Sequence, residues 1–142
     1  MQHAAVDPGR FEGQKGAMQQ LFLVALGGAL GSSLRHVVIV AAQRMAGSAY
    51  PWGTVLVNMV GCFAMGVFIE WLARRMNGSP DIRLFVATGL LGGFTTFSAF
   101  ALDVAVLFER GSIMTAFAYI ALSVVGSLAA LFLGLALARS II

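Results

Sequence analysis

The segment GGFTTFSAF, residues 92–100, interrupts a long apolar run with two glycines, two threonines and three phenylalanines. A helix in the hydrocarbon core of a membrane must satisfy its own backbone groups. Gly92 and Gly93 weaken a helix by about 1 kcal/mol each relative to alanine, and threonine hydroxyls compete for backbone hydrogen bonds. The segment therefore predicts a membrane helix that is broken near its middle. The carbonyl groups freed by such a break form a ligand set for a hard cation.

The composition of the whole chain is that of a membrane protein. Apolar residues make up 59% of the 142 residues, charged residues make up only 11%, and the mean hydropathy is +0.89. These values exclude a soluble domain. Four apolar runs each approach the roughly 20 residues that cross a bilayer; they lie at about 21–42, 53–73, 84–108 and 114–138. We expect an all-α membrane protein in which residues 18–142 form one domain of four transmembrane helices.

The N-terminal residues 1–17, MQHAAVDPGRFEGQKGA, are rich in glycine and carry charges of both signs. This composition predicts a disordered extension. A cleaved signal peptide is the alternative, but the following apolar pattern continues to Ala42, well past the length of a signal-peptide apolar region. The single cysteine, Cys62, lies within the second apolar run and is expected to be a small packing residue.

The basic residues near the ends of the spans predict the orientation in the membrane. When the N-terminal extension is left out, four basic residues lie on the side of the termini and three on the other side. One of these three is Arg35, which approaches that side from within the first span. Such a small bias predicts insertion in both orientations. A chain that pairs with its inverted copy forms a two-fold antiparallel homodimer. The net charge of +3 is scattered over the span ends, which favours contact with lipid headgroups over nucleic acid.

Small residues recur four positions apart at three places in the spans. These pairs are Gly27 with Gly31, Gly126 with Ala130, and Gly134 with Ala138. The spacing lets two helix backbones approach closely. Contacts within one chain and contacts between two chains fit this pattern equally well.

Polar side chains inside the second span form one stripe. Thr54 and Asn58 are four residues apart, and Gly61 follows three residues later, so all three share one helix face. A carboxamide donates two hydrogen bonds without carrying a charge. One interpretation is a polar clamp between helices; the other is a set of donors for a ligand.

The fourth span carries a second stripe, formed by the hydroxyls of Tyr119, Ser123 and Ser127 at intervals of four residues. Two stripes of neutral donors with no basic residue between them suit a small anion that is held weakly. Phe94, Phe97 and Phe100 share a face at intervals of three residues. Packing explains most such faces, although the electropositive edge of an aromatic ring also attracts an anion.

Three stretches together resemble the Fluc/CrcB family of fluoride channels: GALGSSLRH at 28–36, GTVLVNMVGC at 53–62 and GGFTTFSAF at 92–100. The resemblance covers essentially the whole chain after the N-terminal extension. It implies a dual-topology antiparallel homodimer with two fluoride pores and a central structural sodium ion. It also implies passive export of fluoride across the cell inner membrane, which protects the cell from fluoride toxicity.

The same resemblance implies roles for individual residues. The rings of Phe97 and Phe100 would contact fluoride, with Asn58 as a donor beside them. The polar track would be lined by Thr54, Tyr119, Ser123 and Ser127. Arg35 would lie near the aqueous vestibule, and the backbone carbonyls of Gly92 and Thr95 from both subunits would hold the sodium. Many relatives have glutamate where this chain has Asp103, which leaves the role of this carboxylate open.

Three other functions are weaker interpretations. A small proton-coupled multidrug exporter needs a carboxylate deep in the membrane, whereas Glu70 and Asp103 lie toward span ends. An enzyme needs a nucleophile and a base, and the only histidines are His3 and His36. We therefore expect no catalytic activity. A purely structural subunit would leave the two donor stripes and the broken helix unexplained.

Overall fold

Four helical segments of the chain are long and apolar enough to cross a membrane: Gly16–Ala46, Trp52–Arg75, Pro80–Glu109 and Ile113–Ile141. The computed structural model describes residues 8–141, and this part of the chain contains helices and no strand. The expected all-α fold with four transmembrane helices is confirmed. Each segment extends beyond its predicted limits, because backbone hydrogen bonding continues through the charged residues that end the apolar runs.

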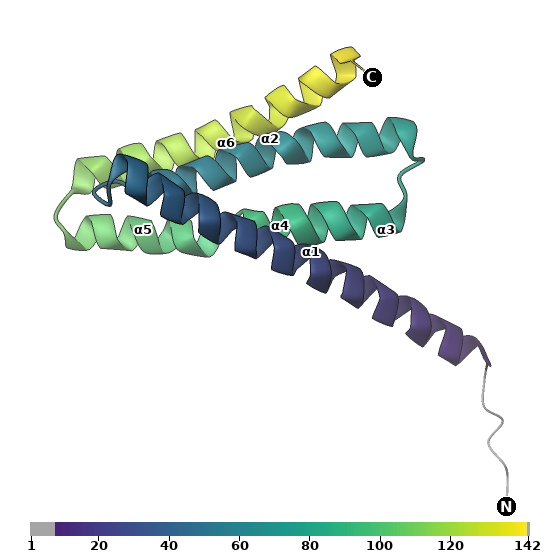
Figure 1. Cartoon of the computed structure of the whole chain (residues 1–142). Coiled ribbons are helices and arrows are strands. Elements are labelled where there is room, and N and C mark those ends of the chain that lie inside the picture. The colour runs from purple at the N-terminus through teal and green to yellow at the C-terminus, as the bar shows by residue number, and fades with distance from the viewer. Residues whose placement is uncertain (1–7, 142) are drawn as a thin grey trace, which may run out of the picture.

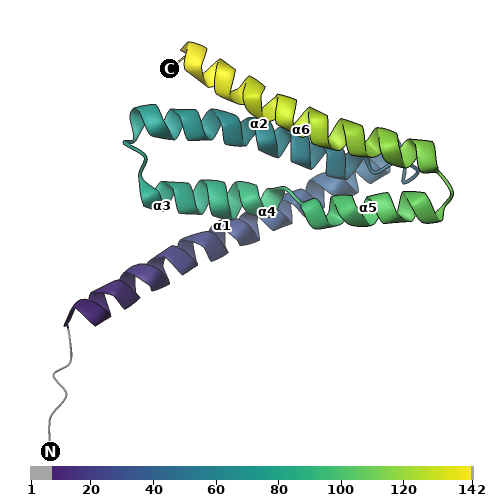
Figure 2. The same cartoon turned by 180° about the vertical axis from the view of Figure 1, so that it is seen from behind.

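The first, second and fourth spans belong to α1 (Pro8–Ala46), α2 (Trp52–Arg75) and α6 (Ile113–Ile141). The third span is composite and consists of α3 (Pro80–Arg83), η1 (Leu84–Leu91), α4 (Gly92–Phe94) and α5 (Phe97–Glu109). Short connections make consecutive spans run in opposite directions, so α2 and α6 run in the same direction (Figure 1). Among pairs of single elements in the described chain, these two helices share the most extensive contact, and α1 packs as extensively on η1 and α4 together. α1 crosses the other spans obliquely, as the reverse view also shows (Figure 2).

α1 begins at Pro8 and is one continuous helix of 39 residues, equivalent to about 58 Å. Residues 8–17 are therefore helical, which differs from the expected disordered extension; residues 1–7 lie outside the described part of the chain. Proline suits the first position of a helix because its missing N–H has no helical partner there. No proline follows within α1 to stop the helix. The N-terminal part of α1 projects beyond α3 (Figure 1).

Close backbone contacts explain several of the small residues. A side chain at Gly27 or Gly31 would overlap backbone atoms of η1, and one at Gly134 would overlap the backbone of α2. Gly126 faces the side chain of Met59. Three of the four glycines in the predicted pairs thus pack backbone against backbone within the chain, and the fourth also faces its own bundle. These glycines tighten the four-helix unit.

The first half of the third span is wound more widely than an α-helix. Leu84–Leu91 forms hydrogen bonds of the π type, between residues five apart. Gly89 in this segment and Gly27 in α1 approach each other directly, because a side chain added to Gly89 would lie 2.9 Å from the Gly27 Cα. The sequence pattern did not predict this winding, since the apolar run is the same for an α-helix and a π-helix.

Candidate functional site

The third span is interrupted at residues 95–96. Thr95 (φ −81°, ψ 160°) and Thr96 (φ −154°, ψ 122°) are extended, and α5 begins at Phe97. The Thr96 hydroxyl accepts a hydrogen bond from the Ala99 N–H at 3.1 Å and so caps α5. The predicted break is therefore present, but it lies at the two threonines. Gly92 and Gly93 remain helical within α4.

Asn58 of α2 holds this break in place. Its Oδ1 accepts a hydrogen bond from the Thr96 N–H at 2.8 Å, and its Nδ2 donates to the Thr96 carbonyl at 3.0 Å. One side-chain amide thus replaces both neighbours that the backbone of Thr96 would have in a continuous helix. The clamp interpretation of Asn58 is correct in this chain. One of the two Nδ2 hydrogens of Asn58 bonds to Thr96, and the other remains available to donate to a ligand.

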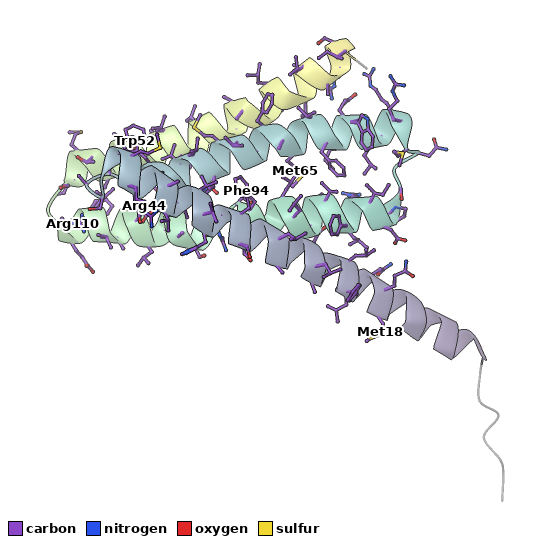
Figure 3. The ribbon with its side chains drawn as sticks, in the orientation of Figure 1. Met18, Arg44, Trp52, Met65, Phe94 and Arg110 are labelled. Atoms are coloured by element: carbon purple, nitrogen blue, oxygen red, sulfur yellow. The ribbon has the colours of Figure 1, made fainter. Side chains whose placement is uncertain are left out.

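Gly61 provides the space for the break one helical turn further along α2. A side chain at this position would overlap the Thr95 methyl group and would approach the ring of Phe94 to 3.1 Å. The Phe94 ring is buried, and it lies between α4 and α2 (Figure 3). In the Asn58-x-x-Gly61 pattern, the polar side chain of Asn58 and the missing side chain of Gly61 therefore both allow the broken helix to pack against α2.

A cavity of about 330 Å³ lies beside the break. Five of the residues predicted for the fluoride pathway line it together: Asn58, Phe97, Phe100, Ser123 and Ser127. The other lining residues are Cys62, Thr95, Thr96, Val124 and Leu128. We call this space the Ser123 cavity. Among the described residues, its walls include no charged side chain, so its polar groups are neutral donors and acceptors.

The hydroxyl of Ser123 is the most unusual polar group in this cavity. Ser123 is only 4% exposed. Its Oγ lies beside the Tyr119 hydroxyl, which donates to Asp103, but it makes no hydrogen bond of good geometry within the described part of the chain. Leaving a buried hydroxyl without a partner costs about 1–3 kcal/mol. A group that is retained at this cost and borders an open space is a candidate ligand donor.

The two phenylalanines predicted for the pathway have different surroundings. Phe100 is 7% exposed, whereas Phe97 is 78% exposed on the outer surface of the single chain. Their ring centroids are 5.3 Å apart, and the Phe100 ring also packs against Tyr119 at 5.4 Å. Only Phe100 is anchored in the core. The Ser123 cavity is thus bordered on one side by an exposed ring.

Thr54 and Tyr119 do not line the Ser123 cavity. Tyr119 is fully buried, and its hydroxyl donates to Asp103 Oδ2 at 2.9 Å. Thr54 and Asp103 line a second cavity of about 230 Å³ at the end of the bundle that holds Tyr50 and Arg110. Arg110, Arg44 and Trp52 all lie at this end (Figure 3). The hydroxyls of Thr54 and Ser123, one in the lining of each cavity, both lie beside that of Tyr119.

The residues predicted for the vestibule and the sodium site meet at the break. Nη1 of Arg35 donates to the Thr95 carbonyl at 3.2 Å. The Thr96 N–H, which would bond the Gly92 carbonyl in a regular helix, is bonded to Asn58 instead. The Gly92 carbonyl is therefore released from its helical partner, and the residue is exposed. Neither Arg35 nor Gly92 lines the Ser123 cavity.

Sequence reasoning missed three contributors to this site. Cys62 was expected to be only a packing residue, yet it lines the Ser123 cavity; its spacing of four residues from Asn58 was the available signal. Thr96 was not assigned a role, although its backbone N–H and carbonyl both bond to the side-chain amide of Asn58. The partner of Asp103 is Tyr119, sixteen residues away along the chain, and no local pattern connects these two side chains.

Comparison with known proteins identifies the family. A family model described as CrcB-like protein, Camphor Resistance (CrcB), matches residues 22–135. The chain belongs to this family. The matched range contains all four helical spans apart from their outer ends, together with every residue that lines the Ser123 cavity.

Curated CrcB relatives match over nearly their whole length. A protein of Chelativorans sp. (strain BNC1) is 58% identical over 125 residues, which cover 88% of this chain and 100% of the relative. A protein of Mesorhizobium japonicum is 57% identical over 124 residues, 87% of this chain and 99% of the relative. A protein of Rhizobium meliloti (strain 1021) is 48% identical over 125 residues, with 88% and 100% covered. All three are named fluoride-specific ion channel FluC.

Proposed function

We propose that this chain is the subunit of a passive, fluoride-selective ion channel. The observation that carries the proposal is the Ser123 cavity, where an unbonded buried hydroxyl, the Asn58 carboxamide and two aromatic rings border one space. The names of the relatives support the same ion. Fluoride accepts hydrogen bonds strongly, so neutral donors suit it better than they suit a larger, weaker acceptor such as chloride.

The chemistry of the lining explains how an ion would pass without being trapped. Removing a small anion from water costs tens of kcal/mol unless the site replaces its hydration shell. The hydroxyls of Ser123 and Ser127, the remaining N–H of Asn58 and the ring edges of Phe97 and Phe100 would replace it. A guanidinium in the same place would bind the anion too tightly for rapid exit.

We infer that two copies of the chain assemble as an antiparallel homodimer. Thr88, Gly92 and Ser98 are exposed along the third span at membrane depth, and His36 is exposed on α1. Lipid cannot satisfy such groups, whereas a second chain can. The Ser123 cavity is bordered by the exposed ring of Phe97, so its outer wall would also come from the second chain. Because each subunit has one Ser123 cavity that the other subunit would close, the dimer would have two pores.

A structural sodium ion at the dimer centre fits the backbone around the break. The Gly92 carbonyl is released from its helical partner, and the Thr95 carbonyl keeps one lone pair after accepting from Arg35. Carbonyl oxygens are the ligands that hard cations prefer. The residues present therefore fit the ion. When bound, sodium would supply positive charge that joins the two broken helices, and it would not be transported.

The protein would work in the cell inner membrane and lower the internal fluoride concentration by passive export. The proton-coupled exporter is the alternative. Its essential carboxylate has no good candidate, because Glu70 is paired with two arginines at a span end and Asp103 accepts from Tyr119.

Fluoride release from proteoliposomes tests the proposed function. Vesicles loaded with potassium fluoride receive valinomycin, and a fluoride electrode follows the external concentration; vesicles loaded with chloride are the control. We expect valinomycin-dependent release of fluoride and little release of chloride. Release that requires a proton gradient would favour the exporter, and no release from folded protein would contradict the channel.

A further inference from the structure

A charged cluster lies at the end of the bundle where α2 and α6 terminate together, the end opposite Trp52, Arg44 and Arg110 (Figure 3). Glu70 of α2 accepts from Arg74 of the same helix at 2.7 Å and from Arg139 of α6 at 3.0 Å. The two arginines bind different oxygens of one carboxylate. Both contacts lie far from the Ser123 cavity, which does not use these residues.

Both guanidinium groups bind Glu70 through the same nitrogen, Nε. Neither side chain has a terminal Nη group bonded to another residue in the described part of the chain. Glu70 is only 15% exposed, whereas Arg74 and Arg139 are 43% and 60% exposed. The carboxylate is therefore a partly exposed brace that both guanidinium groups share, and their terminal Nη groups remain available for another ligand. The planar fork of arginine matches a phosphate group in geometry and charge.

We propose that Arg74 and Arg139, braced by Glu70, bind the phosphate of an anionic phospholipid. The pair sits at the ends of two membrane-spanning helices, where headgroups lie. Trp71, 37% exposed in the next position of α2, has the amphipathic ring typical of the membrane interface. Leu133 and Leu137 are 63% and 43% exposed on α6 before Arg139, which provides apolar surface for an acyl chain. A free phosphate ion would use only the arginines.

The brace makes a prediction that general attraction to a negative membrane does not make. Replacing Glu70 by glutamine removes a negative charge, so simple electrostatics would strengthen the binding of anionic lipid. In the proposed site the same replacement releases both guanidinium groups from their common orientation, and binding of anionic lipid should fall. The sign of this one effect therefore distinguishes a built site from a basic surface.

The two tryptophans of the chain, one at each end of α2, give a matched reporter and control. Trp52→Phe leaves Trp71 beside the proposed site, and Trp71→Phe leaves Trp52 at the opposite end. Each protein is reconstituted in phosphatidylcholine vesicles that contain a small fraction of brominated phosphatidylglycerol, or of brominated phosphatidylcholine. Bromine quenches tryptophan fluorescence only at short range, so excess quenching by phosphatidylglycerol measures local enrichment of the anionic lipid.

We expect phosphatidylglycerol to be enriched about tenfold more near Trp71 than near Trp52, the factor that one charge-assisted hydrogen bond supplies beyond the attraction of the basic residues at both ends. Near Trp52 only the weaker enrichment from the charges of Arg44 and Arg110 is expected. Glu70→Gln and Arg139→Lys should each remove most of the enrichment, since lysine keeps the charge but lacks the fork. Arg44→Gln, at the opposite end, should leave it unchanged. Circular dichroism and gel filtration check folding, and Arg139→Lys carries the test if Glu70→Gln does not fold.

Three results would overturn the proposal. Equal enrichment at both tryptophans would indicate a general surface charge. Stronger enrichment in Glu70→Gln would show that the carboxylate only repels the lipid. Loss of enrichment on addition of inorganic phosphate, at constant ionic strength, would indicate a site for a free anion. None of these results depends on fluoride transport, so the site and the proposed channel function can fail separately.

Discussion

The side-chain amide of Asn58 pairs with both backbone groups of Thr96, accepting at 2.8 Å and donating at 3.0 Å. This relationship joins a side chain of α2 to the only point at which the described part of the third span is extended. It satisfies two backbone groups that lipid could not satisfy. The same amide borders the Ser123 cavity, so a structural bond and a proposed ion contact share one residue.

Asn58→Ala should therefore affect both stability and transport. Loss of two partly buried hydrogen bonds should lower the free energy of unfolding by about 2 kcal/mol, and fluoride release should nearly stop. Thermal unfolding in detergent and the electrode assay measure the two effects. Gln19→Ala is the control, because its carboxamide makes one exposed bond to Asp81. A variant that melts like the parent protein would contradict the clamp.

Gly61→Ala should disturb the break by overlap with Thr95, at a cost of about 1–3 kcal/mol. Gly28→Ala is a matched control in α1, where an added side chain meets no atom within 4 Å. We expect a lower melting temperature and reduced fluoride release for Gly61→Ala alone. Equal melting temperatures for the two variants would show that the break tolerates the extra methyl group.

Alanine substitutions of Phe97 and Phe100 should affect stability differently, so that an effect on transport can be told apart from an effect on folding. Phe97→Ala removes an exposed ring, so the free energy of unfolding of the chain should change by less than about 0.5 kcal/mol while fluoride release falls. Phe100→Ala removes a buried ring and should cost about 3 kcal/mol. Normal fluoride release by Phe97→Ala would remove this ring from the proposed pathway.

Ser123→Ala should leave stability unchanged or raise it, because the variant removes a buried hydroxyl that has no partner in the described chain. Fluoride release should fall about tenfold if the pathway loses a hydrogen bond of about 1.4 kcal/mol. Ser112→Ala, in the turn before α6, provides a control outside both cavities. A destabilised variant with normal release would assign Ser123 a structural role.

Removal of sodium should lower the stability of the assembled protein. Exchange of sodium for N-methylglucamine at constant ionic strength should reduce the melting temperature, and sodium should restore it in a saturable manner. The effect should be greatest where dimer and monomer are in equilibrium, which gel filtration reports. Identical melting curves in both salts would contradict the proposed central ion.

Much of the fold was predictable from local sequence. The four spans follow from apolar runs, and the broken third span follows from residues 92–100, since both depend on how a backbone meets lipid. The position of the break was less predictable. Gly92 and Gly93 stay helical because Gly93 packs closely on Gly28 of α1, whereas the threonines bond to Leu91 and Asn58. Helix propensity describes an isolated segment and not these neighbours.

Helical spacing alone determined which polar residues share a face, and the Ser123 cavity contains both Ser123 and Ser127 as their spacing predicts. Only the tertiary structure decided which faces meet. In the folded chain Thr54 and Asn58 line different cavities, Tyr119 bonds to Asp103, and two arginines bind Glu70. Spacing along one helix is set by its 3.6-residue repeat. Contacts between helices depend on how closely their backbones approach, and in this protein glycines on different helices set that distance.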